Sequence, residues 1–123
     1  MKGEKILYAS DSDLAREGMA AVIEKYASKD GHELIGQASS CKEIKELLEG
    51  GLKPTVFILD PQFPYLSDGQ EAVTLVRRLS PETTIITIAR FEGLKMGDYN
   101  LVADVDVEKL INLLTDLQHK HLS

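Results

Sequence analysis

The chain has 123 residues, a formal net charge of -6, 43% hydrophobic residues and one cysteine. This length suits a single domain over residues 1–123 that buries roughly two-thirds of its unfolded surface. One thiol cannot form an internal disulfide, so a reducing, cytoplasmic location is expected. No stretch approaches the roughly 20 apolar residues that a bilayer requires, and an acidic chain without a Lys/Arg run is a poor phosphate-backbone binder. We therefore expect neither membrane nor nucleic acid among the direct partners of this domain.

Short apolar runs and helix-period segments alternate along the chain. The runs predicted to be strands cover residues 5–9, 32–38, 55–59, 84–89 and 100–103. The predicted helices cover residues 13–27, about 70–79 and about 107–119, and a shorter helix contains the apolar positions Ile44, Leu47 and Leu48. In the first helix the apolar positions predicted to form one core-facing stripe are Leu14, Met19, Val22, Ile23 and Tyr26. This alternation predicts an α/β fold with a doubly wound, five-stranded parallel sheet.

Two aspartates stand directly after predicted strands. Asp11 follows the first strand and Asp60 follows the third. Ligands of doubly wound sheets bind outside the carboxyl ends of the strands, so both carboxylates are expected at that edge. Together they could hold a hard cation such as Mg²⁺, or one could attack phosphorus as a nucleophile. Alternatively, Asp11 caps the first helix and Asp60 begins a turn before Pro61.

These residues resemble the receiver domain of bacterial two-component response regulators, which has a flavodoxin-like fold. Residues 5–11 look like its first strand and acidic pair, and residues 56–60 look like its phosphoacceptor strand. Residues 14–19 are especially similar to receivers that precede a helix-turn-helix output domain. The resemblance covers nearly the whole chain in the right order.

The resemblance implies a signalling role and a site. In the family, a histidine kinase donates a phosphoryl group to the aspartate that matches Asp60. Mg²⁺ is held by that aspartate, by the acidic pair and by the backbone carbonyl that matches Gln62. A Thr or Ser after the fourth strand and a Lys after the fifth then contact the phosphoryl group.

Several positions depart from the family pattern. Ser10 replaces the first acid of the pair, so any Mg²⁺ site is expected to be weak. Ala89 stands where the Thr or Ser belongs, and Ala103 stands where the Lys belongs. Neither alanine can donate to a phosphoryl oxygen. Only thirteen residues separate these two alanines, which leaves room for a turn or two in place of the fourth helix.

Arg90 and the Tyr65-Leu66 pair each have two interpretations. The Arg90 guanidinium could reach Asp60 as a counterion, or it could face solvent at the start of a short loop, which is the more common role of a surface Arg. Tyr65 and Leu66 follow Pro64 as consecutive apolar residues. They are either a lid packed on the domain or a contact for a partner.

The sequence thus favours a degenerate receiver, which is not an enzyme and binds another protein with weak or no dependence on phosphorylation. The partner is expected to be a histidine kinase or a downstream regulator, and a homodimer is a further option. The close alternative is a receiver that still accepts a phosphoryl group at Asp60. A remote alternative is a haloacid-dehalogenase-like phosphatase, because Asp11-Ser12-Asp13 is similar to the Asp-x-Asp nucleophile motif of that family.

Overall fold

The computed structural model describes residues 3–90, 92–102 and 107–122, of which residues 121 and 122 are described by backbone only. Its strands are β1 (Lys5–Ala9), β2 (Glu33–Ala38), β3 (Val56–Leu59), β4 (Thr84–Ala89) and β5 (Tyr99–Val102). Its α-helices are α1 (Asp13–Val22), α2 (Cys41–Glu49), α3 (Leu66–Leu79) and α4 (Val107–Leu122). A π-helical turn (Ile23–Ala27) and a 3₁₀ turn (Ser28–Asp30) continue α1.

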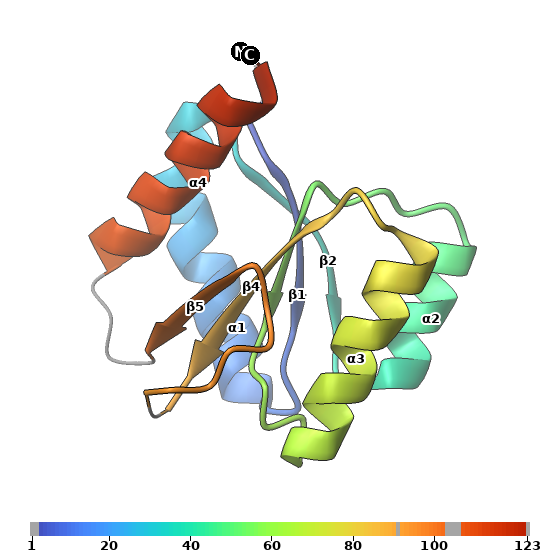
Figure 1. Ribbon diagram of the computed structural model, residues 1–123. Helices are drawn as coiled ribbons and strands as arrows, with labels where there is room; N and C mark the ends of the chain where they lie inside the picture. The colour runs from blue at the N-terminus through green and yellow to red at the C-terminus, as the bar shows by residue number, and fades with distance from the viewer. Residues whose placement is uncertain (1–2, 91, 103–106, 123) are drawn as a thin grey trace.

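The strands form one parallel sheet in the order β2-β1-β3-β4-β5. Helices α1 and α4 cover one face, and α2 and α3 cover the other (Figure 1). Strand residues alternate between the two cores: Tyr8 and Ile58 face α1 and α4, whereas Leu7 and Phe57 face α2 and α3. The predicted fold class is therefore confirmed, including the shortened region before β5.

The helices differ from their predicted extents: α2 extends beyond the apolar positions predicted for it, α4 is longer than predicted, and α1 and α3 differ for identifiable reasons. Helix α3 begins at Leu66 rather than near residue 70, because the Asp68 carboxylate accepts a hydrogen bond from the Tyr65 N–H (3.1 Å) and so caps the first turn. The first predicted helix changes to π geometry after Val22.

The prediction of one apolar stripe on α1 was partly wrong. Leu14 is 79% exposed and Tyr26 is 43% exposed. At about 100° per residue, Leu14 lies about 140° around the helix from Met19. Beyond Val22 the wider π turn advances each residue by a smaller angle, which moves Tyr26 away from the core.

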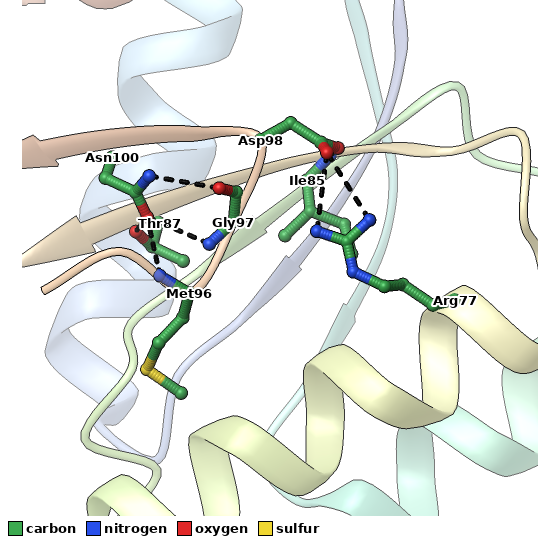
Figure 2. A network of polar contacts seen from close by, with 7 residues as sticks. All are labelled: Arg77, Ile85, Thr87, Met96, Gly97, Asp98 and Asn100. Atoms are coloured by element: carbon green, nitrogen blue, oxygen red, sulfur yellow. Dashed lines mark hydrogen bonds and ion pairs between the residues drawn. The ribbon is translucent and has the colours of Figure 1, made fainter.

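The described residues between β4 and β5 form a short connection without a helix, and side-chain hydrogen bonds hold it in place (Figure 2). Asn100 makes four hydrogen bonds: its Oδ1 accepts from the backbone N–H groups of Met96 (3.0 Å) and Gly97 (2.9 Å) and from Thr87 Oγ1 (2.7 Å), and its Nδ2 donates to the Gly97 carbonyl (3.0 Å). Thr87 is fully buried under this connection. Its hydroxyl is satisfied there without a covering helix.

Asp98 ties the same connection to the sheet and to α3. Its carboxylate accepts from the Ile85 N–H (2.8 Å) and from both terminal nitrogens of Arg77 (3.3 Å each), as Figure 2 shows. Its own N–H donates to the Ile85 carbonyl (2.8 Å). Gly97 passes so close to β4 that a Cβ there would lie 2.9 Å from the Ile85 oxygen. The connection therefore packs directly on the strand.

No helix in the part of the chain that the structure describes is long and apolar enough to span a bilayer.

Candidate functional site

The two candidate acids meet at the carboxyl edge of the sheet. Asp11 and Asp60 follow the paired strands β1 and β3, and the Asp60 N–H donates to the Ala9 carbonyl (3.1 Å). Asp11 is exposed, whereas Asp60 is partly buried. The two charges interact, since Asp11 contributes to raising the pKa of Asp60. The parallel pairing predicted from the sequence thus brings both carboxylates into one site.

The burial of Asp60 is not balanced by groups that would stabilise its negative charge. Burial raises the pKa of the Asp60 carboxyl above its ordinary value, and this is the largest influence on it. The Gln62 N–H, which donates to Asp60 Oδ1 (3.2 Å), and the charge of Arg90 lower this pKa, but not enough to offset the burial. The ionised carboxylate is therefore under-stabilised in the folded chain.

Ser10 is a poor replacement for an acid. It is fully buried, its Oγ accepts a hydrogen bond from the Ser12 N–H (3.2 Å), and its carbonyl accepts from Arg16 Nη1 (2.6 Å). The hydroxyl bonds the Ser12 N–H and Tyr8, and it adds no negative charge that could hold a metal ion. Arg16 also forms an ion pair with Asp13. The phosphatase alternative needs Asp13 as an acid-base group beside Asp11, but here Asp13 is a surface residue paired with Arg16.

Tyr8 is a site neighbour that the sequence reasoning missed. It is 6% exposed and lies on the α1/α4 face of β1. Burial raises the pKa of the Tyr8 hydroxyl most, Ser10 lowers it through a side-chain hydrogen bond, and the charge of Asp60 raises it further. A tyrosine within an otherwise aliphatic strand is the sequence signal that could have identified it.

The positions at the ends of β4 and β5 decide whether a hydrogen-bond donor or a positive charge lies near Asp60. Ala89 is buried at the end of β4 and has no side-chain donor. Arg90 is exposed, and the described residues contain no ion pair between it and Asp60 within 4 Å. Its charge nevertheless lowers the pKa of Asp60. Ala103 lies outside the described residues.

The donor set fits Mg²⁺ only in part. Two carboxylates are present, and Mg²⁺ in proteins is often held by one or two carboxylates together with phosphate oxygens and waters. Within residues 3–90, 92–102 and 107–122 no group of three or more His, Cys, Asp or Glu side chains could hold a metal ion. Gln62 is placed two residues after Asp60, and its N–H, rather than a side chain, bonds the carboxylate. A phosphoryl group would have to complete any metal site here.

Comparison with solved structures relates this architecture to response regulators. The chain is 18% identical to the RcsB response regulator of Salmonella typhimurium, with a TM-score of 0.78 over 97% of this chain and 62% of that one. For the REC domain of AraT from Geobacillus stearothermophilus the identity is 23%, the TM-score is 0.74 and the coverage is 95% and 94%. For the signal receiver domain of NarL from Mycobacterium tuberculosis the identity is 19%, the TM-score is 0.77, and the match covers 95% of this chain and 97% of that one. The chain has the receiver-domain fold. The sequence matches no protein-family model and no curated protein.

Proposed function

We propose that this receiver-fold domain is a signal-transduction module that binds another protein, with weak or no dependence on phosphorylation. The observation that carries the proposal is the composition of the pocket around Asp60. Among the described residues it offers two carboxylates, the Tyr8 hydroxyl, an exposed Arg90 that forms no ion pair with Asp60 within 4 Å, and a buried alanine at position 89. Stabilising a phosphoryl group depends on positive charge and hydrogen-bond donors aimed at its oxygens, and the alanine at position 89 offers neither.

Exposed apolar side chains supply a surface for protein binding at the same edge. Leu14, Tyr65 and Leu66 are 79%, 72% and 40% exposed, and they lie where α1 and α3 begin after β1 and β3. Tyr65 and Leu66 are therefore not a lid packed on the domain. Large exposed apolar residues gathered near one site are typical of surfaces that bind other proteins. A histidine kinase or a downstream regulator is the class of partner that the fold suggests.

Phosphorylation of the purified domain is the direct test. The protein is incubated with acetyl phosphate or phosphoramidate and Mg²⁺, and its intact mass is then measured. We expect little or no gain in mass, in the wild type as in Asp60→Asn. A stoichiometric gain of one phosphoryl group that disappears in Asp60→Asn would overturn the proposal.

A second candidate function is a receiver that accepts a phosphoryl group at Asp60 from a histidine kinase. It is favoured by one observation, the electrostatic action of the Arg90 charge on Asp60. In that case Arg90 would supply positive charge in place of a lysine at position 103. Phosphorylation of the wild type that is slowed at least about tenfold in Arg90→Ala would support this alternative.

A further inference from the structure

A cavity of about 300 Å³ lies beside Asp60, on the face of the sheet that α1 and α4 cover. Most of its wall is apolar and comes from both helices and from β4: Ala15, Met19, Val22, Ile88, Val107 and Leu110. Its polar groups are Tyr8, Asp60 and Arg90. A concave, mostly apolar pocket with a few convergent polar groups is the usual form of a small-ligand site.

The charges around this cavity favour a cationic ligand. Asp60 lines it, and Asp11 adds a second negative charge nearby. Of the two arginines close to the site, Arg16 donates a hydrogen bond to the Ser10 carbonyl and forms an ion pair with the Asp13 carboxylate. Arg90 is exposed and forms no ion pair with Asp60 within 4 Å in the described part of the chain. Among the described residues no cation therefore pairs directly with the Asp60 carboxylate, although the Arg90 charge acts on it from the rim of the cavity.

We propose that this cavity binds an alkylammonium group, with the ammonium paired to the Asp60 carboxylate and the aliphatic chain lying against Met19, Val22, Ile88 and Leu110. The ammonium would replace solvent at a carboxylate whose burial is poorly compensated, and the methylenes would cover apolar wall. The same chemistry is present in a free aliphatic amine and in a lysine side chain of a partner protein. The proposal rests on the proposed function, because it requires an Asp60 that carries no phosphoryl group.

The size of each effect can be estimated. Burying one methylene contributes about 0.8 kcal/mol, so each added carbon should strengthen binding about fourfold until the cavity is filled. Loss of the charged partner in Asp60→Asn should weaken binding about tenfold or more. Arg90→Ala should strengthen it, because a competing cation is removed from the rim of the cavity.

The experiment titrates the unphosphorylated domain with n-alkylamines from ethylamine to hexylamine, without Mg²⁺, and follows the Met19 methyl and the Ile88 and Leu110 amides by NMR. We expect saturable shifts that strengthen with chain length, weaken in Asp60→Asn and stay unchanged in Asp116→Asn. Asp116 is an exposed carboxylate on α4 that does not line the cavity, so this variant is the matched control.

Two ligand comparisons test the charge. Hexanol should bind much more weakly than hexylamine, and hexanoate should not bind. Equal binding of the alcohol would show that Asp60 is not used, and tighter binding of hexanoate, lost in Arg90→Ala, would show an anion site instead. Either result overturns the proposal, as does an Asp60→Asn variant that binds hexylamine normally.

A final arm distinguishes the source of the ammonium. Nα-acetyl-lysine methylamide that binds as well as butylamine indicates a lysine from a partner protein, whereas binding of free amines alone indicates a small amine. If neither class of ligand binds, the inference is refuted. The mass measurement described above is made on the same samples. Failure of amine binding without phosphorylation would therefore refute only this inference, whereas phosphorylation of Asp60 would refute the proposed function.

Discussion

Replacing Asp98 by alanine tests whether this carboxylate holds the β4–β5 connection in place of a helix. In the folded chain Asp98 accepts from the Ile85 N–H at 2.8 Å and from Arg77 at 3.3 Å. Ile85 is fully buried, so its N–H would be left without that partner. An unsatisfied buried donor costs about 1–3 kcal/mol, and an exposed ion pair contributes at most about 1 kcal/mol.

The expected loss for Asp98→Ala is therefore about 1–4 kcal/mol. For a domain of this size each kcal/mol lowers Tm by about 4 °C, so Tm should fall by about 4–16 °C. Urea denaturation followed by circular dichroism measures the free energy of unfolding, and an unchanged m-value shows that the denatured state is unaltered.

Matched variants separate the two contributions of Asp98. Asp98→Asn keeps an oxygen that can accept from the Ile85 N–H and should cost less than about 1 kcal/mol. Arg77→Gln removes only the exposed ion pair and should cost about as little. If Asp98→Ala changes Tm by no more than Arg77→Gln does, the carboxylate does not support β4 and the reasoning is wrong.

Three further predictions concern titratable groups. Asp60→Asn should raise the free energy of unfolding at pH 7, because burial raises the pKa of this carboxyl in the folded chain. The gain should shrink as the pH falls below that pKa and vanish below the ordinary pKa of an aspartate, about 3.9, and a loss of stability at pH 7 would contradict it. Burial lowers the pKa of His32, whose Nδ1 accepts from the Glu4 N–H (2.9 Å). The unfolded chain therefore takes up the proton first, stability should decline as the pH falls below about 6.5, and His32→Gln should flatten that slope in urea denaturation. Burial raises the pKa of Cys41 to about 11, so alkylation by iodoacetamide at pH 7 should be much slower than in urea; equal rates would show an accessible, ordinary thiol.

The sequence contains enough information for the sheet because strand patterns are local. The bounds of β1 and β4 agree with the prediction, and β2 and β3 each begin one residue later than predicted. Strand β5 begins one residue earlier than predicted, and its predicted last residue, 103, lies outside the described residues. That the described residues between β4 and β5 form no helix also follows from counting residues between Ala89 and Ala103. Parallel pairing of β1 with β3 then places Asp11 and Asp60 together. These features depend on periodicity, length and topology.

What the sequence did not reveal depends on contacts between distant residues. Asp98 bonds Ile85 across thirteen positions and Arg77 across twenty-one, and no local pattern indicates that a loop carboxylate will complete a strand. Tyr8 could be predicted as a buried strand residue, but its proximity to Asp60 comes from the packing of two strands. The exposure of Leu14 follows from its angular position at the start of α1.

The β4–β5 connection also bears on whether a phosphoryl group could change the shape of this domain. To move away from the sheet, the connection would have to break the three hydrogen bonds that join Met96 and Gly97 to Asn100 and the two between Asp98 and Ile85. At about 1 kcal/mol for each hydrogen bond, the displaced state lies about 5 kcal/mol above the observed one. A state about 5 kcal/mol higher is populated at roughly 1 part in 5,000, so a ligand must favour it by more than about 5 kcal/mol to make it predominant. A phosphoryl group on Asp60 would need at least that differential stabilisation, yet Ala89 offers it no donor. A shape change of this connection would therefore carry a large free-energy cost, which supports the phosphorylation-independent binding surface that we propose.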